Sequence, residues 1–364
     1  MVSILSVVVL LGVLIFVHEL GHFLTAKFAG VGVLKFSLGF GPRIIGKKVG
    51  ETEYLLSLIP LGGYVKLLGE SEDDAIADAD QGRSFLVQPV WKRIMIVAAG
   101  PIFNFFLATL IFTIVQIWGL PVLLPRIGTI QENSAALRAG LQKSDTIAAI
   151  DGKTIDRWTD MAELINDSGG KILSLTIKRN ENIQILSIQP TMFKGKNIFG
   201  EEVNSYKIGI SPSLETKIER LNPVAALAAG IKQTWGVSKL TLMSVVKMFQ
   251  GVISPKTLGG PIMIAQLAGA QVKEGLIPFV LFMALLSINL AVLNLLPIPI
   301  LDGGHLFFYL IEAVTGKEIN LKWRERAQQI GFALLILLML FVLIMDLDRL
   351  NIKFLQDSSK LFTK

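Results

Sequence analysis

Four long apolar segments dominate the pattern of hydrophobic and polar positions along the chain. They lie at residues 2–17 and onward, 94–118, 276–296 and 327–345. Each approaches the roughly 20 residues that an α-helix needs to cross the hydrocarbon core of a bilayer. The pattern therefore predicts an α-helical polytopic membrane protein with about four transmembrane helices.

Weaker patterns fill the segments between these spans. Residues 36–68 hold apolar stretches broken by Gly and Pro, which predict a membrane-associated β-hairpin that avoids lipid by lying in protein or along a cavity. Residues 121–212 alternate polar and apolar positions between turns, which predicts a small β-rich domain with two short helices. Residues 222–250 predict amphipathic helices, either at the membrane interface or packed on the protein.

These patterns predict the order of domains along the chain. The expected segments are a first transmembrane helix at 1–28, a cytoplasmic loop with the β-hairpin at 29–91, a second transmembrane helix at 92–119, the inserted α+β domain at 120–212, amphipathic interfacial helices at 213–275, a third transmembrane helix at 276–300, a second cytoplasmic loop at 301–326, a fourth transmembrane helix at 327–346 and a C-terminal tail at 347–364.

Composition supports the membrane-protein class and excludes several other classes. The 364 residues have a mean hydropathy of +0.58, and only 18% are charged. The chain has no cysteine, which excludes disulfides and thiolate metal sites. The net charge of +6 is not gathered into a basic helix, so no nucleic-acid partner is expected. The first apolar segment lacks a basic start and a cleavage site, which favours a retained helix over a signal peptide.

Basic residues predict the orientation. Lys and Arg gather in residues 35–93 and 317–326, and loops rich in these residues stay on the cytoplasmic side. Both termini and the domain at 120–212 are then expected on the extracytoplasmic side.

The first apolar segment ends in an HExxH sequence, His18-Glu19-Leu20-Gly21-His22. Residues four apart on a helix project from one face, so the two imidazoles can bind one metal ion while Glu19 serves as the base. Two of the three histidines of the chain form this motif. Two structural histidines beside an unrelated Glu are the alternative, which the cost of such groups in a membrane disfavours.

Asp302 is the expected third metal ligand. A catalytic zinc site takes three protein ligands and one open position, and few acidic residues lie in the apolar regions. Asp302 follows Pro297 and Pro299, which break helical hydrogen bonding, and it lies at the same predicted depth as the HExxH motif. The alternative is that Asp302 only caps the following helix.

The roles of two nearby residues, Asn294 and His305, stay open. Asn294 is expected to bind a substrate carbonyl or the developing oxyanion, or else to form an interhelical hydrogen bond. His305 is expected to support the site rather than to bind metal, although an imidazole is a possible ligand.

The chain resembles the site-2 protease family of intramembrane zinc metalloproteases, and within it the bacterial regulator of sigma-E protease type. The resemblance covers nearly the whole chain and rests on His18 to His22, Gly39-Phe40-Gly41-Pro42, Gly100-Pro101-Ile102-Phe103-Asn104, Gly259-Gly260-Pro261-Ile262, and Asn294 through Gly303. It implies one Zn²⁺ per chain, bound by His18, His22 and Asp302, with Glu19 as catalytic acid and base. It also implies a substrate-binding set of Asn294, Pro297, Pro299, Ile59, Gly62, Gly63 and Tyr64.

The resemblance further implies what the protein acts on and where. The strand around Ile59 to Val65 would pair with an unwound transmembrane helix of a single-span membrane protein, such as an anti-sigma factor or a remnant signal peptide. This is regulated intramembrane proteolysis at a bacterial inner membrane, with the active site toward the cytoplasm. The domain at 120–212 resembles a PDZ domain of unidentified ligand, and the chain has room for one where the best-known type has two. A scaffold or a metal carrier is the rival function, and either would leave Glu19 dispensable.

Overall fold

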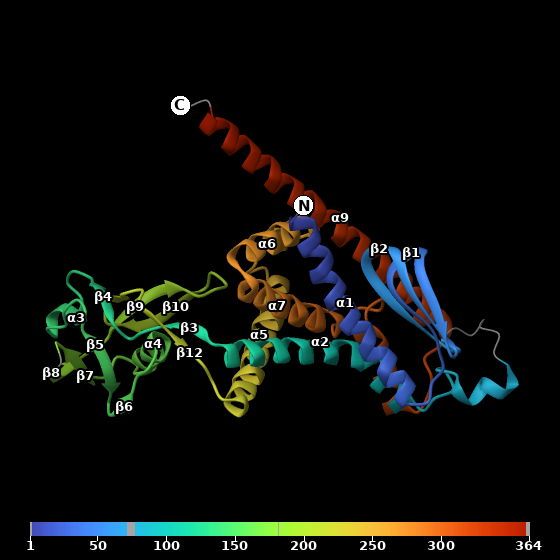
Figure 1. Cartoon of the computed structure of the whole chain (residues 1–364), viewed down its shortest axis with the longest axis horizontal. Coiled ribbons are helices and arrows are strands. Elements are labelled where there is room, and N and C mark those ends of the chain that lie inside the picture. Colours follow the sequence, from blue (N-terminus) through green and yellow to red (C-terminus); the bar gives the residue numbers. More distant parts are fainter. Residues whose placement is uncertain (1, 71–76, 181, 362–364) are drawn as a thin grey trace. The chain divides into compact units, whose positions relative to one another are not determined.

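The computed structural model describes residues 2–70, 77–180 and 182–361, which fall into two compact units (Figure 1). The first unit comprises the described parts of residues 1–113, 227–245 and 254–364, and the second comprises residues 114–226 and 246–253.

Helices dominate the first unit. They are α1 (Val2–Phe28), the first part of α2 (Val90–Trp118), the middle of α5 (Pro223–Phe249), α6 (Pro261–Glu274), α7 (Leu276–Asn294), α8 (Asp302–Thr315) and α9 (Leu321–Leu361), with single 3₁₀ turns at Asp78–Arg83 and Pro255–Thr257. Among the described residues, four helices are long and apolar enough to cross a bilayer: Leu5–Phe28, Val90–Trp118, Leu276–Asn294 and Lys322–Leu350. They coincide with the four predicted spans, as a multi-pass membrane protein requires.

Helix α7 lies at the centre of this bundle. One apolar cluster joins Leu10 and Leu14 of α1 to Ala268 of α6 and Phe279 of α7. A second cluster joins Phe112 and Ala108 of α2 to Ala284 and Ile288 of α7. These contacts hold α1 and α2 around α7, so residues distant in sequence meet inside the bundle.

Helix α5 packs on the bundle through polar side chains. The Thr234 hydroxyl lies 3.0 Å from the Thr109 hydroxyl of α2, and Thr241 donates a 2.8 Å hydrogen bond to Asn289 Oδ1 of α7. Its apolar residues Ile231 and Trp235 remain exposed. The polar face of α5 therefore packs on the protein, and a position of its apolar face at a membrane interface stays a prediction.

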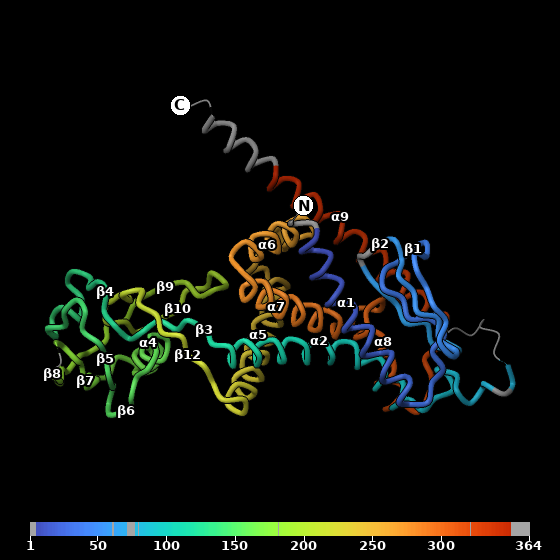
Figure 2. Tube along the Cα trace, viewed as in Figure 1, coloured from blue at the N-terminus to red at the C-terminus, as the bar shows by residue number. Residues whose placement is uncertain are grey.

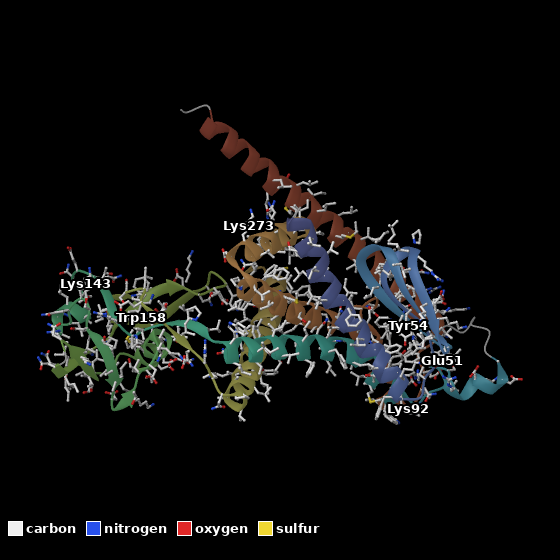
Figure 3. All side chains as sticks on the ribbon, viewed as in Figure 1. Glu51, Tyr54, Lys92, Lys143, Trp158 and Lys273 are labelled. Atoms are coloured by element: carbon white, nitrogen blue, oxygen red, sulfur yellow. The ribbon has the colours of Figure 1, made fainter. Side chains whose placement is uncertain are left out.

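The predicted hairpin is present and is longer than its sequence pattern suggested. It consists of β1 (Val33–Val49) and β2 (Thr52–Leu67), which pair antiparallel with several register shifts. Residues 35–38 have register partners both in 53–56 and in 63–66, so the two strands bend and their segments lie side by side in one sheet (Figure 2). Tyr54 and Phe36 of the hairpin contact the Phe23 ring of α1, at centroid distances of 5.9 and 5.3 Å; Tyr54 is labelled in Figure 3.

Asp346 ties α9 to the start of α6. Its carboxylate accepts hydrogen bonds from the backbone N–H groups of Gly260, Ile262 and Met263, at 3.1, 3.0 and 3.1 Å. Helix N-termini leave such donors unpaired and carry partial positive charge, so a buried carboxylate is stabilised there. The Gly259-Gly260-Pro261 motif therefore has a structural role, because it leads into the helix start that binds Asp346.

Two elements of the first unit differ from the predicted organisation. Residues 302–315, within the segment expected to be a cytoplasmic loop, form helix α8. Helix α9 continues to Leu361, through most of the segment expected to be a tail.

The second unit is rich in β-structure. Its central sheet has the strand order β6-β5-β7-β8, from Lys153–Thr154, Thr146–Ile150, Leu173–Arg179 and Asn182–Ile188. Two-stranded pairs are formed by β3 (Leu120–Leu123) with β12 (Thr216–Glu219), β4 (Ile127–Ile130) with β11 (Ile210–Pro212), and β9 (Thr191–Lys196) with β10 (Glu202–Lys207). The two predicted helical pieces are α3 (Ala135–Arg138) and α4 (Trp158–Asp167).

Alternating side chains of these elements form the core of the second unit. Ile147, Leu175 and Ile177 are fully buried from β5 and β7, and Met161 of α4 packs on them. Trp158, labelled in Figure 3, packs at the edge of this cluster. Period-2 burial on β7 matches the alternation from which the sheet was predicted.

The stability of the second unit depends on an ion pair with a buried carboxylate, and this dependence can be tested. Asp145 is 1% exposed and accepts hydrogen bonds from Arg179 Nε at 2.8 Å and Nη2 at 2.7 Å. Arg179→Met should destabilise the unit, because it leaves the buried Asp145 carboxylate without its cation. Native-state hydrogen exchange of the β5 and β7 amides in the full protein measures this change.

The matched control is Arg126→Met. Arg126 Nη1 donates to both carboxylate oxygens of Glu215, but the two side chains are 37% and 49% exposed. Its loss should cost less than about 1 kcal/mol, since exposed pairs are screened by water. If the two substitutions destabilised the unit equally, the conclusion that burial strengthens the Asp145–Arg179 pair would be wrong.

Candidate metal centre

Helix α1 presents three polar side chains of the HExxH motif near its C-terminal end. The helix is continuous through the motif, so His18 and His22 share one face. Their Nε2 atoms lie 3.3 Å apart, and the imidazole rings meet edge to face. Two metal-binding nitrogens are therefore directed at one point.

Asp302 reaches the same point from the other end of the sequence. Its Oδ2 atom lies 3.1 Å from His18 Nε2 and 3.6 Å from His22 Nε2. In a tetrahedral zinc site with bonds of about 2.0–2.1 Å, neighbouring ligand atoms lie about 3.3 Å apart. The three measured separations bracket that value. Oδ2 is buried and has no other hydrogen-bond partner among the described residues, which fits an atom that faces a cation.

The irregular segment 295–301 positions Asp302. Helix α7 ends at Asn294 and α8 begins at Asp302, with Pro297 and Pro299 between them, as predicted from the proline break. A Cβ at Gly303 would lie 2.2 Å from Leu296 O, so only glycine allows α8 to start so close to the turn. No side-chain capping hydrogen bond is made at the start of α8, which disfavours the alternative that Asp302 serves only as a cap.

Helix α2 supports both imidazoles. His22 Nδ1 donates to the Ile96 carbonyl oxygen at 2.9 Å, and the Asn104 amide lies 3.2 Å from His18 Nδ1. Between them, a Cβ at Gly100 would lie 2.3 Å from His22 Nε2. Residues 96, 100 and 104 follow one helical face, so one stripe of α2 holds the ligands and leaves room for them.

Glu19 lies between the metal centre and the hairpin. It is adjacent to His18 on α1 but is outside the group of His18, His22 and Asp302 whose ligand atoms all lie within 4.8 Å of one another. A Cβ at Gly63 would lie 3.0 Å from Glu19 Cγ and 2.8 Å from Ser37 O. β2 therefore passes close to the Glu19 side chain because position 63 has none.

The other predicted site residues lie at varied distances from this centre. Asn294 Nδ2 lies 3.4 Å from His18 Nε2, at the end of α7. The Tyr64 ring is parallel to the Phe40 ring at 6.3 Å, over Gly62, where a Cβ would collide with Phe40. Ile59 is 46% exposed in β2. The structure thus brings Asn294 and Gly63 to the centre, whereas Ile59, Gly62 and Tyr64 contribute to the hairpin surface.

His305 lies outside the three-residue group, one turn beyond Asp302 on α8. Burial lowers its pKa, and the positive charge of Arg324 lowers it further. Its supporting role beside the centre stays a prediction.

Sequence reasoning did not assign Ile96, Gly100 or Asn104 to the centre. Gly100 and Asn104 were noted only as part of a family motif. That motif was the available signal, but a local pattern does not show which helix packs against the HExxH face.

Comparisons with known proteins agree with this centre. The model of peptidase family M50 matches residues 6–338. A relative from Rhizobium meliloti (strain 1021) is 35% identical over 353 residues, covering 93% of this chain and 94% of its own length. One from Campylobacter jejuni is 35% identical over 350 residues (96% and 94%), and one from Clostridium acetobutylicum is 36% identical over 344 residues (94% and 97%).

The names of all three relatives describe zinc metalloproteases, in agreement with the predicted enzyme class and cofactor. The family match covers most of the chain and includes every residue of the metal centre. The chain therefore belongs to peptidase family M50, the site-2 protease family of metalloproteases that its motifs resemble.

Proposed function

We propose that this chain is a zinc endopeptidase that hydrolyses a peptide bond within or beside a transmembrane helix of a protein substrate. The observation that carries the proposal is the triangle of His18 Nε2, His22 Nε2 and Asp302 Oδ2, with sides of 3.3, 3.1 and 3.6 Å. Both histidines lie in an apolar helix long enough to cross a bilayer. Polar groups are costly at that depth and are functional by default.

The donor set fits one zinc ion. Two neutral imidazoles and one carboxylate are common ligands of catalytic zinc, and three protein ligands leave one position open. When bound, zinc would polarise the scissile carbonyl and make a water molecule more acidic. We assign His18, His22 and Asp302 as its ligands.

Glu19 moves the proton in this proposal. It is placed beside the ligands by the helix itself and next to Gly63 of the hairpin. It accepts a proton from the attacking water and passes it to the leaving amine. Asn294, 3.4 Å from His18 Nε2, is close enough to donate to the substrate carbonyl as negative charge develops on its oxygen.

The hairpin provides an edge for an extended substrate. Residues 63–67 have strand partners only in 33–38, in the part of the chain that the structure describes, whereas 35–38 are paired on both sides. A helical peptide bond is shielded by its own hydrogen bonds, so it must be extended before hydrolysis. Adding the substrate as a strand beside Gly63 would replace those hydrogen bonds and lay the peptide near Glu19.

Finer features of the proposal follow from resemblance and charge. We assign the protein to the regulator of sigma-E protease type, acting on anti-sigma factors or remnant signal peptides in regulated intramembrane proteolysis. The basic segments 35–93 and 317–326 favour an inner-membrane orientation with those loops in the cytoplasm. Pro297 and Pro299 would help hold substrate in the open turn before Asp302.

We also propose that the second unit is a single PDZ-type domain on the extracytoplasmic side. Its two helices and its four-stranded sheet β6-β5-β7-β8 support that assignment. Arg126 is already paired with Glu215, so a peptide carboxylate would have to be bound by other groups.

Glu19→Gln separates chemistry from metal binding. Cleavage of a test transmembrane substrate by the purified protein should fall by about 10²–10⁴-fold, because the amide cannot accept the proton. The zinc content should stay at one ion per chain, since Glu19 lies outside the ligand group. Full cleavage by this variant would exclude the proposed mechanism.

Asp302→Ala tests the third ligand. The variant should lose most of its bound zinc, because two imidazoles alone leave the site incomplete. His305→Gln is the matched control and should keep its zinc, since His305 lies outside the ligand group. Elemental analysis of both purified variants gives the answer, and undiminished zinc in Asp302→Ala would place the third ligand elsewhere.

Gly100→Ala tests the packing of α2 on the ligands. The added methyl would lie 2.3 Å from His22 Nε2, so zinc binding should weaken by at least tenfold. Gly12→Ala, in α1 where a Cβ would meet nothing within 4 Å, should bind zinc as the unaltered protein does. The zinc dissociation constants of the two variants are compared by competition with a chelator, and equal values would refute the close approach.

A further inference from the structure

We infer that Asn104 is a positioning residue that holds the His18 imidazole in the tautomer and orientation that metal binding requires. The inference rests on the proposed function, in which His18 is a zinc ligand. It concerns a side chain that is completely buried and lies outside the ligand triangle.

Asn104 approaches His18 on the side away from the other ligands. Its Nδ2 atom lies 3.2 Å from His18 Nδ1, while His18 Nε2 faces Asp302 Oδ2 at 3.1 Å. The backbone of Asn104 is fixed from a third helix, because Ser287 of α7 donates a 2.8 Å hydrogen bond to its carbonyl oxygen. The amide is therefore held against the imidazole by packing of α2 on both α1 and α7.

The amide has one unused end. Asn104 Oδ1 is buried and makes no hydrogen bond to any part of the chain that the structure describes. The two ends of an amide exchange places by a half-turn of the terminal torsion, and the hydrogen-bond network decides between them. In one orientation the amide donates to His18 Nδ1, and in the other Oδ1 accepts from it.

These two orientations match the two tautomers of His18. Without metal, Nδ1 accepts from the Asn104 amide, and the hydrogen is carried by Nε2, which lies 3.1 Å from Asp302 Oδ2. With metal, Nε2 must be unprotonated, so Nδ1 carries the hydrogen and needs an acceptor. Asn104 can supply that acceptor after the half-turn. An amide serves both states, which neither an apolar side chain nor a lysine would do.

His22 shows why this partner matters. Its Nδ1 atom donates to the carbonyl oxygen of Ile96, a backbone acceptor that no substitution removes. Ile96 and Asn104 are eight residues apart on the same face of α2, on either side of Gly100, so each ligand has one partner on that face. Asn104 is thus the side-chain counterpart of the Ile96 carbonyl.

The test compares three variants of the purified full chain. Asn104→Leu keeps the size of the side chain and removes the acceptor, and it should weaken zinc binding by about 10–100-fold. Asn104→Asp keeps an acceptor at Nδ1 and should bind zinc at least as tightly as the unaltered protein. Ser287→Ala removes the contact to the Asn104 backbone without touching the imidazole, and it should weaken zinc binding less than Asn104→Leu does. Zinc dissociation constants come from chelator competition, and the visible absorption of the Co²⁺-substituted protein reports the ligand geometry.

The outcomes separate positioning from packing. The inference is overturned if Asn104→Leu binds zinc with unaltered affinity, or if the Leu and Asp variants lose affinity equally. If the Leu variant does not fold, Asn104→Ala, which also removes the acceptor, is measured in its place, with weakened zinc binding expected and unaltered binding overturning the inference. His18→Ala separates this inference from the proposed ligand set. If zinc binding survives the loss of the His18 side chain, the ligand set itself is wrong.

Discussion

The site depends on bringing three donor atoms to one point inside an apolar helical bundle. His18 and His22 are close because they are four residues apart on α1, but Asp302 must be brought to them across 280 residues of chain. Two close approaches make this possible. α2 lies against α1 where Gly21 and Gly100 have no side chains, and α8 starts against the 295–299 turn where Gly303 has none. A side chain at any of these glycine positions would collide with the neighbouring element. The geometry of the metal ligands is therefore a consequence of close backbone packing.

The same packing explains why the polar groups tolerate an apolar setting. Each buried imidazole has a partner on α2, and Asp302 faces both rings. Buried polar groups are costly unless they are hydrogen-bonded or coordinate a metal. The hairpin extends this arrangement, since Gly63 allows a strand edge to run next to Glu19. Metal ligands, base and strand edge therefore meet in one small volume of the first unit.

Much of this could be predicted from local sequence. The spans follow from runs of apolar residues, the His18–His22 pair from helical spacing, and the approach of Asp302 from prolines at membrane depth. Helix α8 was missed because Gly303 and Gly304 resemble a loop, although their small size is what allows that helix to pack on the turn. The contact of Asn104 with His18 could not be predicted, since it depends on which face of α2 meets α1. The double pairing of residues 35–38 with two segments of β2 could not be predicted either, because the apolar pattern does not show where the strands bend.

The most direct test of the central claim is X-ray absorption at the zinc edge of the purified protein. The account predicts one zinc ion with two imidazole nitrogens and carboxylate oxygen at about 2.0–2.1 Å, and with no scattering from sulfur. His18→Ala should lose most of its zinc, and with it the absorption edge, because only two of the three ligands remain. A six-coordinate shell of oxygen alone, or a spectrum that does not change in His18→Ala, would contradict the account.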